Sequence, residues 1–187
     1  MGCKQGVART RVGYTGGTAP DPTYKRLGDH TESVQTDFDP AAVDYRELLE
    51  LFWRSHNASR PAWSRQYMSA VFYLDEEQER LASEVKRSLE EAAGRELRTE
   101  ILSASRFYLA EDYHQKYILQ GDRILGQEFR RMYPEFSDFV DSPAAAKVNG
   151  YLYGCGSLEQ VRTELSSLGL SAKGADHLLS RVRRHGS

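Results

Sequence analysis

Residues 66–102 read QYMSAVFYL-DEEQERLASEVKRSLEEAA-G-RELRTEIL, and this stretch decides the expected fold. Its first nine residues are rich in aromatic and β-branched side chains, which predicts a strand. Asp75 is a suitable N-cap for the charged segment that follows, where apolar residues recur at four-residue steps. Gly94 is expected to end this helix, and residues 98–102 predict a further strand. The order strand, helix, strand indicates a domain of mixed α and β structure.

The flanking segments extend this pattern. Residues 8–14 alternate weakly before a Thr-Gly-Gly loop, and residues 33–38 alternate again, so two more strands are predicted. Asp44 with Glu47 forms a capping pair for an amphipathic helix, whose buried stripe is expected to contain Leu48, Leu51 and Phe52. From residue 111 onward the pattern is almost wholly helical. Pattern alone therefore predicts an α+β fold with a helical C-terminal third.

Composition narrows the class of protein. The 187 residues suffice for one domain with a substantial core, and 40% hydrophobic with 28% charged residues is ordinary for a globular chain. A net charge of -2 argues against a nucleic-acid or anionic-membrane partner, and no apolar run approaches the ~20 residues that span a bilayer. Two cysteines, Cys3 and Cys155, suit a reducing compartment, so we predict a cytoplasmic protein.

Six short strings then occur in a fixed order along the chain. They are VGYTGG (12–17), PTY (22–24), HTE (30–32), ELLELFW (47–53) with His56, QYMSA (66–70) and FYLAEDYHQ (107–115). Each string alone is weak, but their joint occurrence at compatible spacing is highly specific. Over about residues 6–118 the chain resembles the A-class methionine sulfoxide reductases.

The resemblance implies a ferredoxin-like α+β sandwich that reduces the S epimer of methionine sulfoxide, free or in oxidised proteins. It implies no bound cofactor, and thioredoxin or another dithiol as the reductant. We accordingly expect a reductase-like domain over residues 1–121 and a helical C-terminal extension over residues 122–187. The scattered histidines lack the spacing of metal ligands, so no metal is expected.

The resemblance also assigns site residues. Cys3, in a Met-Gly-Cys string, matches the family's nucleophile, and Glu32 matches the glutamate that protonates the sulfoxide oxygen. Tyr24 and Tyr67 match two tyrosines that hold this oxygen. For Cys3 the alternative is a disordered terminal residue. Cys155 is a candidate resolving thiol, and the alternative is a small buried apolar residue between helices.

The chain also departs from the family pattern. The Phe-Trp-Gly string and the helix expected after the nucleophile are absent between Cys3 and Gly6, and so is the preceding strand. Ala62 stands where many members have an aspartate; Ser64 or Arg65 is considered as its replacement, and Trp63 as a replacement for the aromatic pair. Because positioning a nucleophile contributes several kcal/mol of the barrier, we expect little or no activity from this chain, although the family it resembles is catalytic. The alternative function is a truncated isoform or relative without catalysis, acting at most as a binding module.

Overall fold

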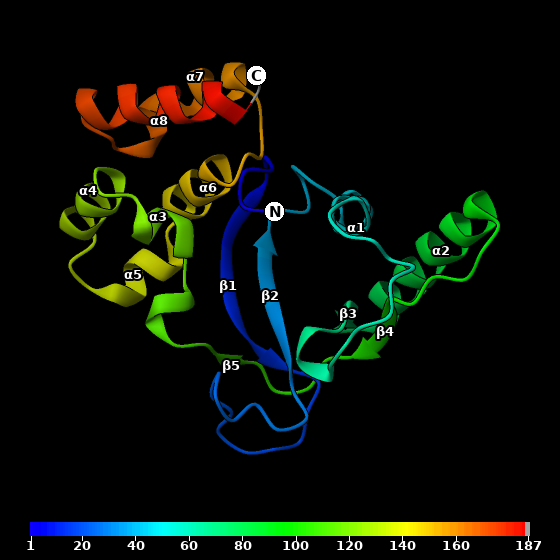
Figure 1. Ribbon diagram of the computed structural model, residues 1–187. Helices are drawn as coiled ribbons and strands as arrows, with labels where there is room; N and C mark the ends of the chain where they lie inside the picture. Colours follow the sequence, from blue (N-terminus) through cyan, green and yellow to red (C-terminus); the bar gives the residue numbers. More distant parts are fainter. Residues whose placement is uncertain (186–187) are drawn as a thin grey trace. The chain divides into compact units, whose positions relative to one another are not determined.

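The computed structural model describes residues 1–185, and Figure 1 labels its helices and strands. Contacts divide the chain into two compact units. The helical unit consists of Met1–Arg11, Gln35–Ala42 and the chain from Glu111 onward. The mixed unit consists of Val12–Val34 and Val43–Ala110. Because the units interleave along the chain, they do not test the expected boundary at residue 121.

The strand–helix–strand stretch that decides the fold lies in the mixed unit. It forms β3 (Ala70–Tyr73), α2 (Glu76–Ala93) and β4 (Glu100–Ser103), and β3 pairs in parallel with β4. The Asp75 side chain accepts a hydrogen bond of 2.8 Å from the backbone N–H of Gln78, as expected of an N-cap. Gly94 ends α2 in the left-handed conformation, with φ of 61°. The predicted helix and both its ends are confirmed.

The strand before α2 is shorter than predicted. Residues Arg65–Tyr67 form a 3-10 turn, so the strand begins only at Ala70. The turn is fixed by tertiary contacts, since the Thr31 hydroxyl donates to the Arg65 carbonyl at 3.0 Å. A contact between residues 34 positions apart overrides the local strand propensity.

Helix α1 (Tyr45–Arg54) begins after Asp44, whose carboxylate accepts the backbone N–H of Glu47 at 2.7 Å. Its buried residues are Leu48, Leu49 and Trp53, while Leu51 and Phe52 are only half-buried. Of the predicted stripe, Leu48 is confirmed as buried, Phe52 packs against a core cluster while partly exposed, and Leu51 is only partly buried. Leu49 and Trp53 pack instead in one core cluster with residues of α2, β3 and the segment before β4. These are Ala82, Val85, Val71 and Leu97.

Strands β1 (Val7–Thr15), β2 (Thr31–Phe38) and β5 (Tyr108–Leu109) form a sheet in the order β2-β1-β5. β1 and β5 are antiparallel, with Gly13 opposite Leu109 and Tyr14 opposite Tyr108. Glycine is required at position 13, because a Cβ atom there would collide with the Tyr108 carbonyl oxygen and the Phe107 ring. The sequence did not predict β5, since two residues are too few for a visible alternation.

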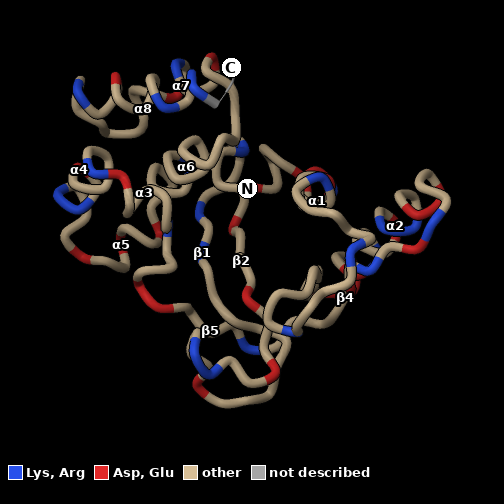
Figure 2. The backbone as a smooth tube through the Cα atoms, in the orientation of Figure 1, with Lys and Arg blue, Asp and Glu red and all other residues tan. Residues whose placement is uncertain are grey.

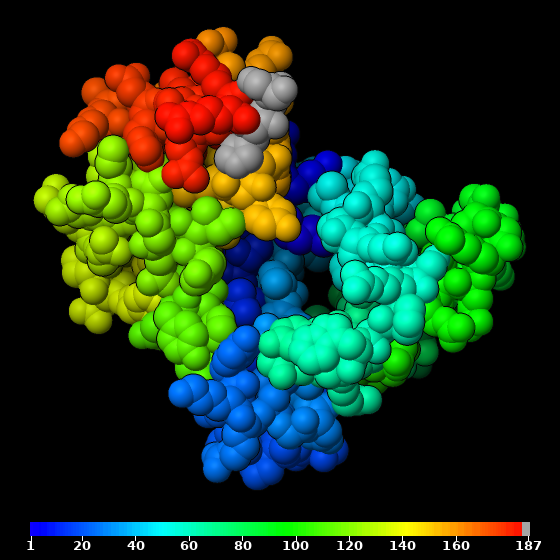
Figure 3. Space-filling model, viewed as in Figure 1, coloured from blue at the N-terminus to red at the C-terminus, as the bar shows by residue number. Residues whose placement is uncertain are grey.

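The helical unit contains α3 (Tyr117–Gly121), α4 (Leu125–Met132), α5 (Phe136–Asp141), α6 (Pro143–Leu152), α7 (Leu158–Glu164) and α8 (Ala172–His185). Its core is built around fully buried side chains such as Phe129, Val148 and Tyr151. Helices α7 and α8 pack together and form the orange and red region of Figure 3. The prediction of a helical C-terminal third is confirmed.

The fold is therefore a mixed one, with a three-stranded and a two-stranded sheet among many helices. Acidic and basic side chains both occur along α2, where Arg80 pairs with Glu77 and Glu84 (Figure 2). None of the helices formed by residues 1–185 is both long and apolar enough to cross a membrane.

Candidate active site

Three of the residues predicted from separate strings meet in the mixed unit. The Gln66 side-chain amide donates to a carboxylate oxygen of Glu32 at 2.7 Å and to the Tyr67 hydroxyl at 3.1 Å. The Tyr67 hydroxyl shares a further hydrogen bond of 3.1 Å with the Tyr24 hydroxyl. The result is a continuous hydrogen-bonded row from Glu32 to Tyr24. Gln66 was not predicted as a site residue, although it is part of the QYMSA string.

Each side chain of this row is placed by its backbone. Glu32 lies near the start of β2, and Tyr24 lies in a short loop closed by the bridge between Thr23 and Arg26. Gln66 and Tyr67 belong to the 3-10 turn at Arg65–Tyr67. The phenol groups of Tyr24 and Tyr67 remain partly accessible, with 36% and 38% of each residue exposed. The row is therefore ordered and still open to a ligand.

Arg65 fixes the turn that carries Gln66 and Tyr67. Its guanidinium donates to the backbone carbonyls of Asp29 at 2.7 Å and Gly16 at 3.0 Å. The turn is thereby joined to the loop between β1 and β2. Arg65, one of the two residues considered as replacements for the family's aspartate, therefore bonds to backbone carbonyls. The buried Ser64 hydroxyl has no hydrogen-bond partner within the part of the chain that the structure describes.

The loop between β1 and β2 is held by Asp29 and His30. The Asp29 carboxylate accepts the backbone N–H groups of Ala19 and Thr18, and these bonds hold its pKa well below the usual range. His30 is 1% exposed, accepts from the Gly17 N–H at 3.3 Å and donates to the Ala19 carbonyl at 2.8 Å. His30 is therefore a structural hydrogen-bonding group.

A second histidine, His56, has the same structural character. It bonds the Phe52 carbonyl at 2.9 Å and the Thr99 hydroxyl at 2.8 Å. Among residues 1–185 no group of three or more His, Cys, Asp or Glu side chains is arranged to hold a metal ion.

The hydrogen-bonded row also shifts the acidity of one phenol. The bond to Tyr24, followed by burial and the nearby Glu32 charge, raises the pKa of Tyr67 to about 12. Tyr67 therefore stays a neutral hydrogen-bond donor through the physiological range. Trp63 stacks on the Tyr67 ring, with centroids 4.8 Å apart and planes inclined by 29°, and is 80% exposed. It adds an open aromatic face beside Tyr67.

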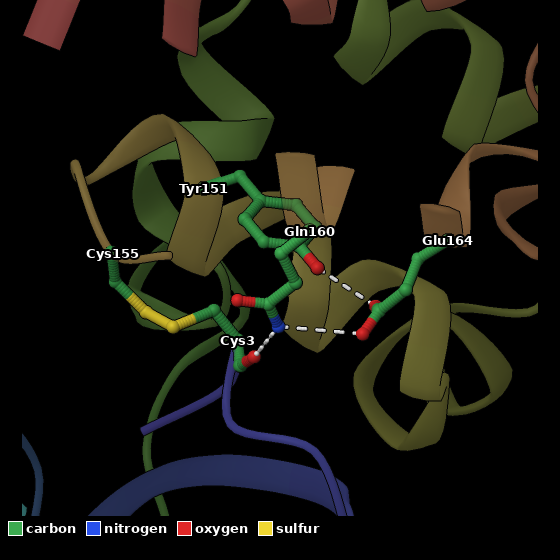
Figure 4. The surroundings of a disulfide bond; sticks show 5 residues. All are labelled: Cys3, Tyr151, Cys155, Gln160 and Glu164. Carbon is green, nitrogen blue, oxygen red and sulfur yellow. Dashed lines mark hydrogen bonds between the residues drawn. A yellow bond between two sulfur atoms is a disulfide. The ribbon is translucent and has the colours of Figure 1, made fainter. Parts of the chain in front are cut away.

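Cys3, the remaining predicted residue, lies in the helical unit. It is 9% exposed and belongs to the same core cluster as Phe129 and Tyr151, so it is not a disordered terminal residue. Its sulfur is bonded to that of Cys155, with 6.1 Å between the Cα atoms (Figure 4). Cys155 lies in the turn between α6 and α7 and is half-buried. The two predicted thiols are thus paired, while Glu32, Tyr24 and Tyr67 form their own group in the mixed unit.

Comparison with known proteins gives a consistent result. The family model described as "Peptide methionine sulfoxide reductase" matches residues 1–144. A peptide methionine sulfoxide reductase of Drosophila melanogaster is 43% identical over 173 residues, which cover 91% of this chain and 69% of that protein. Peptide methionine sulfoxide reductase A5 of Arabidopsis thaliana is 40% identical, over 81% of this chain but only 61% of the relative's length.

Solved structures agree with the sequence comparisons. Mxr1 from Saccharomyces cerevisiae in reduced form superposes with a TM-score of 0.58 at 26% identity, covering 63% of this chain and 74% of that one. Methionine sulfoxide reductase A of Corynebacterium diphtheriae gives a TM-score of 0.54 at 29% identity, covering 63% and 65%. With a family model that matches well over half of its residues, the chain belongs to the peptide methionine sulfoxide reductase family.

Proposed function

We propose that this chain reduces methionine S-sulfoxide, free or in oxidised proteins, to methionine, with Cys3 as nucleophile and Glu32 as proton donor. The observation that carries this proposal is the row formed by Glu32, Gln66, Tyr67 and Tyr24. Three of these residues, Glu32, Tyr24 and Tyr67, belong to three separate strings of the sequence. Their contact in one hydrogen-bonded row is what strings that recognise one site would give, and it supports the proposal.

The row supplies what sulfoxide reduction needs. A sulfoxide oxygen is a good hydrogen-bond acceptor but a poor leaving group, so it must receive a proton as its sulfur is attacked. Gln66 occupies one carboxyl oxygen of Glu32, and the other oxygen is then the one that delivers the proton. One hydroxyl proton lies in the hydrogen bond between Tyr24 and Tyr67, so one phenol donates to the sulfoxide oxygen while that bond persists, and both donate once the substrate oxygen replaces it.

The thiols of Cys3 and Cys155 together supply the two electrons that reduction of one sulfoxide requires. The Cys3 thiolate attacks the sulfoxide sulfur, the oxygen is protonated and passes to the Cys3 sulfur, and the thioether leaves with Cys3 as a sulfenic acid. The Cys155 thiolate then attacks the Cys3 sulfur, water leaves and the disulfide forms. An external dithiol, for which we propose thioredoxin, takes up the two oxidising equivalents and restores both thiols.

Several finer features belong to the same proposal. They are a ferredoxin-like arrangement, a reductase domain over residues 1–121 with a helical extension over residues 122–187, and a cytoplasmic location. The family match that begins at residue 1 takes in Cys3, Glu32 and both tyrosines. It therefore favours an enzyme over a binding module.

The test is reduction of methionine S-sulfoxide by the purified chain with dithiothreitol, using the R epimer as a blank. We expect turnover that falls at least about a thousandfold in Cys3→Ser and about a hundredfold in Glu32→Gln. Glu91→Gln, at an exposed position of α2, is the matched control and should leave the rate unchanged. A cooperatively folded parent chain that reduces neither epimer would contradict the proposal.

A further inference from the structure

The chain around Cys3 is held against α6 by more than the disulfide. Gly2 approaches α6 so closely that a Cβ atom there would collide with the Ala146 carbonyl oxygen. On the other side of the contact, a Cβ atom at Gly150 would lie 2.8 Å from the Cys3 nitrogen and 3.3 Å from the Cys155 sulfur. Two glycines thus allow close backbone contact beside the sulfur–sulfur bond.

Gln160 adds a specific hydrogen bond to the same segment. Its side-chain amide nitrogen donates to the Cys3 carbonyl oxygen at 2.7 Å, although 157 residues separate the two positions (Figure 4). Gln160 lies at the third position of α7 after the N-cap Ser157, where a glutamine commonly bonds back to the N-cap backbone. Here its amide contacts the N-terminal segment, so it joins α7 to Cys3.

The Gln160 side chain is itself oriented by a buried polar network. Its amide nitrogen also lies 3.3 Å from a carboxylate oxygen of Glu164. The other oxygen of Glu164 accepts from the Tyr151 hydroxyl at 2.7 Å and from the Lys147 ammonium at 2.6 Å. Tyr151 is fully buried and the Glu164 side chain is 16% exposed, so the network is sheltered from solvent.

We propose that Gln160 is a positioning residue that keeps Cys3 beside Cys155 when both are thiols. Without docking, the two thiols would have to find each other across a sequence separation of 152 residues. With the segment docked, oxidised glutathione takes two electrons and two protons from the thiols of Cys3 and Cys155 and becomes two reduced glutathione molecules, and the new bond joins two sulfurs that are already neighbours. If Cys3 forms a sulfenic acid during turnover, docking should speed its reaction with Cys155, and this part of the inference rests on the proposed function. The effect of Gln160 on the thiol–disulfide equilibrium does not depend on the proposed function.

The test is equilibration of the full chain in glutathione buffers, with the Cys3–Cys155 bond quantified by thiol alkylation and mass spectrometry. Gln160→Met keeps the volume and removes the donor, and we expect the effective concentration of the two thiols to fall about tenfold. Gln160→Lys restores a donor to the Cys3 carbonyl and should recover most of this loss. Glu159→Gln, exposed on the same helix, is the matched control and should not differ from the parent.

A second variant separates positioning from folding of α7. Gly2→Ala adds a methyl group against Ala146 without altering a helix, and it should also lower the effective concentration. The proposal is overturned if Gln160→Met stays within twofold of the parent, whatever the result for Gly2→Ala, or if the bond does not form. A shifted glutathione equilibrium in a chain that does not reduce sulfoxide would support the positioning role and refute only the proposed function.

Discussion

The hydroxyl oxygens of Tyr24 and Tyr67 lie 3.1 Å apart, although 43 residues separate them in the sequence. Tyr24 comes from a loop and Tyr67 from a 3-10 turn. Their hydrogen bond is the largest cause of the raised pKa of Tyr67, and it joins residues of the PTY and QYMSA strings. The raised pKa of Tyr67 can be measured without an assay of catalytic turnover.

Tyr24→Phe should lower the pKa of Tyr67 from about 12 toward its ordinary value of 10. A phenol whose pKa is raised by folding contributes stability that is complete below pH 10 and is lost as the pH rises from 10 to about 12. The variant should therefore lose less stability than the parent over that window. Ring resonances of Tyr67 in an NMR titration and urea melts at several pH values measure both effects. An unchanged Tyr67 titration would contradict the assigned hydrogen bond.

Gln66→Met should lower kcat about tenfold with little change in KM, because it frees the Glu32 carboxyl without removing a group that touches substrate. Steady-state kinetics with N-acetyl methionine S-sulfoxide separate the two constants. Gln127→Met, at an exposed position of α4, is the matched control. A rise in KM with constant kcat would instead make Gln66 a binding residue.

The sequence was informative where neighbouring residues determine the structure. Asp75 and Gly94 mark both ends of α2 because a cap acts within one turn of its own helix. The sequence was not informative where a contact with a distant residue determines the local backbone conformation. The turn at Arg65–Tyr67 replaces a predicted strand through a hydrogen bond from Thr31, and no local pattern reports it.

The same contrast between local and long-range information applies to the candidate site. Glu32, Tyr24 and Tyr67 were found through a resemblance, which compares strings of residues. Gln66 and Gln160 were missed because their importance lies in partners 34 and 157 positions away. Surface glutamines are common, and only the structure distinguishes these two from the others. An S-x-x-Q string at Ser157 signals a helix start but not a contact with Cys3.

Asp122→Asn should destabilise the helical unit by about 2–3 kcal/mol at neutral pH. The Asp122 side chain is 4% exposed and accepts from His177 at 2.9 Å and Arg181 at 3.1 Å, both on α8. Although burial raises its pKa, the bonds from His177 and from two backbone N–H groups outweigh burial and lower it. Its stabilisation is therefore present above pH 3.8 and lost as the pH falls through the lowered pKa.

Urea unfolding at pH 7 and pH 3 measures this effect. Asp176→Asn, an exposed position on α8, is the control and should change stability by no more than about 0.5 kcal/mol. An Asp122 variant as stable as the parent at pH 7 would show that α8 is held by its apolar contacts alone.

Lys116→Met should abolish a gain of stability with rising pH that the parent owes to its buried ammonium. Burial lowers the pKa of Lys116 to about 8, while its ammonium donates to the carbonyls of Thr10 and Val140. Between pH 8 and 10.5 the unfolded chain binds more protons here, so the parent should gain stability as the pH rises, by up to about 3 kcal/mol. Melts of parent and variant at pH 7.5 and 10 test this, and parallel curves would contradict it.

Trp63→Ala should raise KM for methionine sulfoxide severalfold and leave kcat almost unchanged. The exposed indole face stacks on Tyr67, so it lies beside the phenol proposed to hold the sulfoxide oxygen. A substrate methyl or thioether carbon resting on such a face gains apolar and sulfur–aromatic contact of about 1 kcal/mol. Trp63→Phe keeps an aromatic surface and should lose about half as much.

Fluorescence provides a check that does not depend on turnover. Trp53 is 6% exposed and Trp63 is 80% exposed, so Trp53→Phe leaves one solvent-accessible indole as a reporter. Saturating N-acetyl methionine S-sulfoxide should protect this indole from acrylamide quenching by about twofold, because a bound ligand covers its face. Because Trp63 lies against Tyr67, equal quenching with and without ligand would mean that substrate approaches the tyrosine pair from another side. It would also exclude Trp63 as a substrate contact, whatever the kinetics of the alanine variant.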